Sequence, residues 1–101
     1  MKFDTLDGFQ WDEVNREKCA KHGVSLSEIE AVFFRPGLLV LEDTAHSTDE
    51  ARFIVIGRSR AARPLFVCFT LRDTGGKRLI RPISARYMHD REVRAYEERY
   101  R

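Results

Sequence analysis

The chain has 101 residues, of which 43% are hydrophobic and 34% are charged, a composition typical of a single globular domain with a charged surface. No apolar run is long enough to span a bilayer, and the first residues, MKFDTLDGFQWDE, lack the apolar core of a secretory signal. We therefore expect one domain over residues 1–101, a cytoplasmic location and no association with a membrane.

Cysteine and histidine are too scattered to indicate a metal site or a disulfide framework. Cys19 and Cys68 form no CxxC pair, and the three histidines lie at His22, His46 and His89. A zinc site needs clustered ligands. We expect two reduced thiols that serve in packing, no metal and no other cofactor.

Charge is divided unevenly along the chain. Residues 1–57 contain 6 lysines and arginines against 11 acidic residues, whereas residues 58–101 contain 12 against 5. A basic C-terminal half indicates an anionic partner, of which nucleic acid is the commonest. The same division is also typical of a basic surface that pairs with the acidic half, and charge alone does not separate the two.

Two helices are predicted first. Asp12 is a good cap for a helix over 13–22, which Lys21 and His22 close at the end where the helix dipole favours cations. Gly23 supplies the left-handed residue that ends many helices. Lys21 and His22 are thus explained by helix termination, by a role in catalysis, or by both.

Ser25 and Glu28 form the capping box S-x-x-E of a second helix, which carries apolar residues at helical spacing as far as Phe33. Pro36 and Gly37 stop it. The two helices therefore form a helix-turn-helix corner.

The rest of the chain changes to strand patterns and ends in a helix. Four segments are rich in β-branched and aromatic residues, and a DTGG turn joins the last two: 38–42, 51–59, 64–72 and 78–86. Pro82 predicts an edge position or a bulge. Asp90 is a plausible cap for an amphipathic final helix. The order predicts an α+β domain with an antiparallel sheet.

Arginine is concentrated at the ends of the predicted strands, at Arg52, Arg58, Arg81 and Arg86. A guanidinium binds phosphate through two parallel hydrogen bonds and stays charged at cellular pH. If these ends lie on one sheet face, they form a basic surface for RNA. Arginines at strand ends also serve simply to solvate a sheet edge and prevent aggregation, so that explanation stays open.

RNA cleavage needs a base for the 2′-hydroxyl, cations for the charged phosphorane and an acid for the leaving oxygen. His22 is the first candidate for the acid or base, and Lys21 for charge stabilisation. His89 and Glu97 lie near the final helix. The residues alone therefore indicate a basic α+β domain that could bind or cut RNA.

Six motifs in a fixed order carry a more specific signal: F-x-W-D at 9–12, KHGVS at 21–25, E-x-RF at 50–53, IGRS at 56–59, ISAR at 83–86 and R-x-x-R-x-YE at 91–97. Together they resemble the BrnT family of bacterial toxins over nearly the whole chain, from about Phe9 to Glu98. In one departure, this chain has Cys19 in a region of the first helix where many members have Asn.

The resemblance implies a RelE-like α+β fold with two N-terminal helices, a four-stranded antiparallel sheet, with or without an extra short N-terminal strand, and a C-terminal helix. It implies a metal-independent ribonuclease toxin that blocks translation. The matching positions imply a set of catalytic candidates: Lys21, His22, Arg52, Arg58, Ser84, Arg86 and Glu97. The RNA-binding candidates are Arg58, Arg81 and Arg86.

The resemblance also implies a partner, a BrnA-like antitoxin with a ribbon-helix-helix region, through which the complex contacts DNA only indirectly and represses its own operon. Two other functions stay open. The chain could be a catalytically inactive toxin-like subunit that acts only in a DNA-binding autoregulatory complex, or a small RNA-binding protein without a toxin role.

Overall fold

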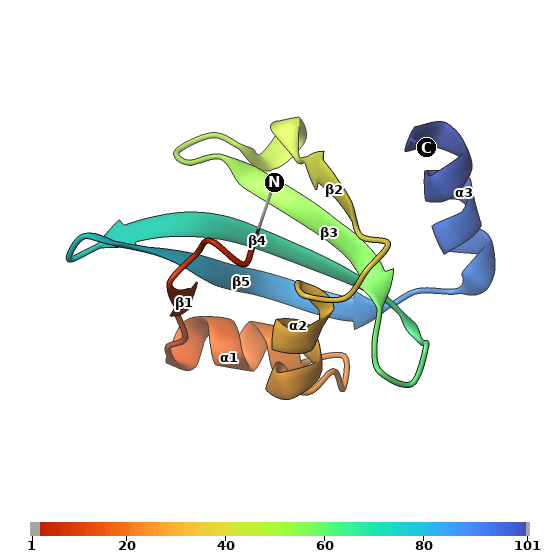
Figure 1. Cartoon of the computed structure of the whole chain (residues 1–101), viewed down its shortest axis with the longest axis horizontal. Helices are drawn as coiled ribbons and strands as arrows, with labels where there is room; N and C mark the ends of the chain where they lie inside the picture. The colour runs from red at the N-terminus through yellow and green to blue at the C-terminus, as the bar shows by residue number, and fades with distance from the viewer. Residues whose placement is uncertain (1–2, 101) are drawn as a thin grey trace.

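The computed structural model describes residues 3–100 and shows an α+β fold, as the sequence predicts (Figure 1). The elements follow in this order: β1 (Gly8–Phe9), α1 (Glu13–Ala20), α2 (Leu26–Val32), β2 (Leu39–Glu42), the 3₁₀ turn η1 (Thr44–His46), β3 (Arg52–Arg58), β4 (Pro64–Thr74), β5 (Lys77–Tyr87) and α3 (Asp90–Tyr100). Among residues 3–100, no helix is long and apolar enough to cross a membrane.

The five strands form one sheet in the order β1-β5-β4-β3-β2. β2 to β5 are antiparallel, and a hairpin turn between Thr74 and Lys77 joins the two longest strands. β1 adds a short parallel pairing to β5 through Gly8 and Phe9. The predicted sheet of four antiparallel strands with an extra short N-terminal strand is therefore confirmed.

The helical corner also has the predicted form. Asp12 and Asn15 cap α1 reciprocally, because each side-chain oxygen accepts the other residue's backbone N–H, at 3.1 and 2.7 Å. Gly23 has a φ of 77°, the left-handed conformation expected after a helix. The Ser25 hydroxyl then caps α2 by accepting the Glu28 N–H at 3.1 Å.

α1 and α2 cover one face of the sheet, and the main hydrophobic core lies between the helices and that face (Figure 1). Phe33, which ends α2, packs edge-to-face against both Phe3 and Phe69 with ring centroids 5.0 Å apart in each case. Cys19 is fully buried in this core, in keeping with the expected packing role. Burial raises the pKa of its thiol to about 11.

The other face of the sheet, which we call the open face, is covered only in part. α3 packs on one end of it through Val93 and Tyr96, against a second cluster that contains Leu39, Ile56 and Phe66. In Figure 1, α3 stands beside one end of the sheet, on the side away from α1 and α2. Most of the open face is therefore left for the polar side chains of β3, β4 and β5.

β5 contains the bulge that Pro82 predicts. Cys68 of β4 pairs with Ser84, but the next residue, Phe69, pairs with Pro82, so Ile83 is the extra residue. Proline has no N–H to donate to a ladder, and β1 pairs with β5 only before this point. The bulge decides which side chains of β5 reach the open face.

Candidate active site

Two predicted residues, Ser84 and Arg86, lie side by side on the open face. Ser84 pairs with Cys68, and Arg86 pairs with Phe66, whose ring belongs to the cluster under α3. Directly opposed residues of antiparallel strands point to the same face. The side chains of Ser84 and Arg86 therefore stand in adjacent rows, at the border between the part that α3 covers and the open part.

The Arg86 guanidinium is held in place from two directions. Its central carbon, Cζ, lies 4.5 Å from the centre of the Phe66 ring. Its two terminal nitrogens donate to the two carboxylate oxygens of Glu92, at 3.0 and 2.8 Å. The pKa of Arg86 is raised, chiefly by this hydrogen bonding to Glu92. With its side chain 40% exposed, Arg86 is a fixed and permanently charged donor that a phosphate can reach.

Cys68 lies beside Ser84 and is half-buried. Burial raises the pKa of the Cys68 thiol, although a hydrogen bond with Ser84 acts in the opposite direction. A thiol that keeps its proton is a poor nucleophile. Cys68 therefore shapes the site and leaves the chemistry to its neighbours.

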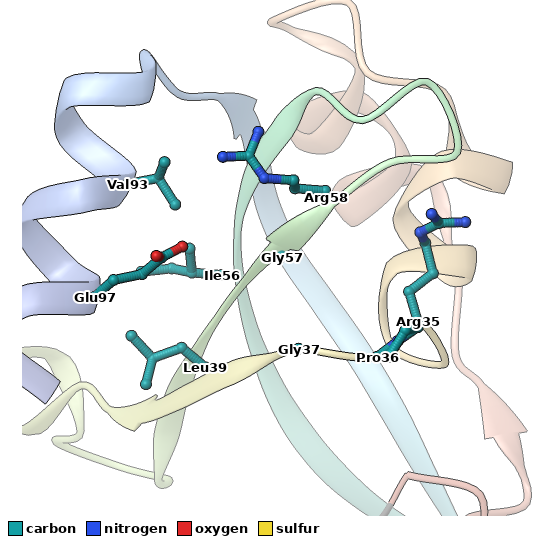
Figure 2. A pocket seen from close by; sticks show the side chains of 9 residues that line it. All are labelled: Arg35, Pro36, Gly37, Leu39, Ile56, Gly57, Arg58, Val93 and Glu97. Carbon is teal, nitrogen blue, oxygen red and sulfur yellow. The ribbon is translucent and has the colours of Figure 1, made fainter. Parts of the chain in front are cut away.

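Arg58 and Glu97 both line a pocket between the end of β3 and α3 (Figure 2). The pocket has a volume of about 270 Å³, and Arg35 from the α2–β2 connection lines its far side. Figure 2 shows the Glu97 carboxylate directed into it from α3. Arg58 donates to the Ala62 carbonyl at 3.0 Å and to Asp90, the first residue of α3, at 3.4 Å.

Lys21 and His22 lie elsewhere. Both are exposed in the connection between α1 and α2, and the Lys21 N–H bonds back to the Lys18 carbonyl to end α1. Both helices lie on the side of the sheet opposite the open face (Figure 1). The structure therefore supports the helix-ending role of this pair and does not bring it together with Arg86. Its catalytic role stays a prediction.

Arg52 and Arg81 form a third group, farther along the open face. They line a separate hollow at the edge of β5, together with Lys18 and Arg72. The sequence-predicted residues are thus divided among the open face near Ser84, the pocket below α3, the edge of β5 and the helical corner.

The match to a family model identifies the class of protein to which this arrangement belongs. Residues 11–92 match the model of the family described as "Ribonuclease toxin, BrnT, of type II toxin-antitoxin system". The chain belongs to the BrnT family. A comparison with curated proteins finds no match. The predicted resemblance to BrnT is confirmed, and with it membership of a family of ribonuclease toxins that work with an antitoxin.

The BrnT match includes a residue that sequence reasoning missed, Glu92, which is also the last residue matched. Its role follows only from the fold, because α3 has to turn back over β5 before Glu92 can reach Arg86. The nearest sequence signal is the cluster of acidic residues in the first turn of α3, Asp90 and Glu92, which is equally typical of ordinary helix starts. Each carboxylate binds a different candidate arginine: Asp90 binds Arg58, and Glu92 binds Arg86.

Replacing Glu92 by Gln in this BrnT chain is expected to flatten the pH dependence of stability in acid. The hydrogen bond from Arg86 holds the pKa of Glu92 below its usual value of 4.5 in the folded protein. Ionised Glu92 therefore stabilises the fold above the unfolded pKa, and this contribution is lost as the pH falls through the folded pKa.

Urea unfolding of both proteins at neutral pH and at a pH of about 3 measures the effect. The wild type should be more stable than Glu92→Gln at neutral pH, and the difference should shrink in acid. An equal difference at both pH values would show that the Arg86–Glu92 pair makes no electrostatic contribution.

Proposed function

We propose that the chain is a metal-independent endoribonuclease toxin whose active site is the part of the open face around Ser84 and Arg86. The observation that carries the proposal is the Arg86 guanidinium, held over the Phe66 ring and by Glu92 with its side chain still 40% exposed. Family membership supports RNA as the substrate. A fixed cation on a sheet face that a single strand can reach is suited to a scissile phosphate.

In the proposed reaction the ribose 2′-oxygen attacks the adjacent phosphorus, and the bond to the 5′-oxygen breaks. Arg86 stabilises the extra negative charge of the phosphorane, because its donors are already oriented and need not reorganise. The Ser84 hydroxyl can donate a further hydrogen bond to the same phosphate. His89, which precedes α3 and whose charge acts on Glu92, is the nearest histidine in sequence and a candidate for proton transfer.

The carboxylates beside this site favour a mechanism without a metal. Glu92 binds Arg86 with both oxygens, and Glu50 at the other end of the open face binds Arg72 with both oxygens. Glu92 and Glu50 are each neutralised by an arginine, whereas Asp43, whose charge also acts on the Cys68 thiol, binds His46. Cleavage that uses the substrate's own 2′-hydroxyl needs only cations and proton carriers.

The proposed biological role is the arrest of translation through RNA cleavage, with neutralisation by a BrnA-like antitoxin. The ribbon-helix-helix region of that antitoxin would provide the contact with DNA. Membership of a type II toxin–antitoxin family supports a protein antitoxin as the partner. The alternative is a toxin-like subunit without catalytic activity that acts only in a DNA-binding complex.

Expression of this chain alone is expected to arrest growth and degrade cellular RNA, and co-expression of the ribbon-helix-helix partner should relieve both effects. RNA integrity after induction is the measurement, and Arg86→Ala at the same protein level is the control. Unchanged growth with intact RNA at good protein levels would contradict the enzyme and favour the regulatory subunit.

A further inference from the structure

A second basic hollow lies at the edge of β5, and we call it the edge hollow. It has a volume of about 160 Å³, and four cations from four different elements line it: Lys18 of α1, Arg52 of β3, Arg72 of β4 and Arg81 of β5. It opens beyond the point where β1 stops pairing with β5, at Ile80. The fold therefore brings together side chains that lie up to 63 positions apart in the sequence, as Lys18 and Arg81 do.

Two of these cations are fixed by carboxylates. Arg81 donates to both carboxylate oxygens of Asp12 at 2.8 and 3.3 Å, and its side chain is only 13% exposed. Arg72 donates to both carboxylate oxygens of Glu50 at 3.1 and 2.9 Å. These pairs form a rigid, charged wall around the hollow.

The other two cations, Lys18 and Arg52, have no side-chain hydrogen bond or ion pair among residues 3–100. Arg52 and Arg81 both pair with Thr70, which stands between them, but Thr70 is only 1% exposed and its hydroxyl donates to the Ala51 carbonyl at 2.9 Å. No bulky side chain therefore separates the two arginines. With two carboxylates against four cations, the hollow keeps an excess of two positive charges.

The edge hollow lies where the open face meets the edge of β5: Arg52, Arg72 and Arg81 come from the strands, and Lys18 comes from α1 on the other side of the sheet. Cys68 lies between the two groups, because it pairs with Ile54 and Ser84, one row from the pairing of Arg52 with Thr70 and one row from the pairing of Phe66 with Arg86. Arg52 lies four residues before Ile56 in β3. Ile56 pairs with Phe66, which in turn pairs with Arg86, so these three residues form one row across the sheet. At the usual rise of a strand, the two rows are roughly 13 Å apart.

We propose that the edge hollow binds a backbone phosphate of the substrate RNA a few nucleotides away from the bond that is cut. Lys18 and Arg52 contact the phosphate, whereas Arg72 and Arg81, fixed by Glu50 and Asp12, shape the hollow around it. An RNA strand lying along the open face from Arg86 reaches the hollow without leaving the sheet. This inference rests on the proposed function, because it takes the RNA substrate as the occupant.

The test uses the full chain with Lys18 and Arg52 both replaced by alanine. The matched control replaces Lys77 and Arg60, two exposed cations in the β4–β5 hairpin and the β3–β4 turn. The probe for binding is a short 2′-O-methyl RNA of mixed sequence, which cannot be cut, titrated over a range of salt concentrations. Because Lys18 and Arg52 share one phosphate, the slope of log affinity against log salt should become shallower by about 0.7 in the test variant and stay unchanged in the control.

Cleavage assays on a long and a short substrate distinguish a phosphate-binding subsite from the catalytic centre. Arg52 is one of the catalytic candidates that the resemblance implies, but its row lies roughly 13 Å from that of Arg86. The test variant should therefore raise KM for a long RNA far more than it affects the cleavage of a dinucleotide, which does not reach the hollow. An unchanged salt slope would overturn the proposal, as would an equal loss on both substrates, which would make Lys18 and Arg52 part of the catalytic centre. Unchanged RNA binding with lost binding of the antitoxin would also overturn it. A reduced salt slope in a chain that cuts neither substrate would support the edge hollow while the proposed function failed.

Discussion

Replacing Arg86 by alanine is expected to lower the rate of RNA cleavage about 10²–10³-fold while the protein stays folded. The guanidinium is oriented by Phe66 and Glu92 before substrate arrives, so its contribution grows as the phosphorane charge develops. The loss should appear in kcat more than in KM. Single-turnover cleavage of a defined RNA, together with the melting temperature of the same preparation, measures both effects.

Two further variants make this result specific. Arg86→Lys keeps the charge but lacks the planar fork that donates in parallel to Glu92 and stacks on Phe66, so most of the activity should still be lost. Arg60→Ala removes an arginine from the exposed β3–β4 turn and should cost little. Equal activity of Arg86→Ala and Arg60→Ala would remove Arg86 from the active site.

His22→Ala in the same assay decides the role predicted for the helical corner. A loss comparable to that of Arg86→Ala would mean that RNA contacts both sides of the sheet and that His22 takes part in the reaction. Full activity per folded molecule, with a small loss of stability, would restrict His22 to closing α1.

The elements could be predicted because their signals are local. The Asp12 and Ser25 caps, the left-handed Gly23 and the glycine turn after Thr74 each specify a boundary through chemistry within a few residues. Pro82 predicted an edge position or a bulge, because a missing N–H has the same consequence in any sheet, and the structure has the bulge. One local expectation was incomplete. The Glu28 carboxylate does not return a bond to the Ser25 N–H but accepts the hydroxyl of Tyr87, the last residue of β5, at 2.9 Å.

The composition of the site could not be predicted to the same degree, because it depends on which face each side chain takes. Arg81 and Arg86 are five positions apart, so in a regular strand they would point to opposite faces. The extra residue Ile83 changes this alternation and places both on the open face. Similarly, no local pattern shows that α3 turns Glu92 towards Arg86, or that α1 carries Lys21 to the other side of the sheet.

Asn15 links a local feature to a long-range one, because its buried amide joins the cap of α1 to the bulge in β5. The side chain of Asn15 is only 2% exposed. Its oxygen accepts the Asp12 N–H at 2.7 Å, and its nitrogen donates to the carbonyls of Gln10 and Pro82, each at 2.9 Å. The Pro82 carbonyl belongs to the irregular part of β5, where the ladder does not supply a regular partner.

Replacing Asn15 by alanine is therefore expected to destabilise the protein by about 2–4 kcal/mol, because it removes three hydrogen bonds and leaves buried carbonyls without donors. In a domain of this size the melting temperature should fall on the order of 10 °C or more. Urea unfolding and thermal melting of the full chain measure the change. The matched control is Arg16→Ala, one residue along on the exposed side of α1, which should change stability by less than about 0.5 kcal/mol.

The variant Asn15→Asp separates the contribution of the amide oxygen of Asn15 from that of its amide nitrogen. Aspartate can still accept the Asp12 N–H and keep the cap, but it presents a negative oxygen to the carbonyls of Gln10 and Pro82. If the donated bonds hold the bulge, Asn15→Asp should be at least as unstable as Asn15→Ala, despite its intact cap. Wild-type stability of Asn15→Asp would show that only the cap matters. The alternation that brings Arg81 and Arg86 to one face would then be fixed by the Pro82 backbone alone.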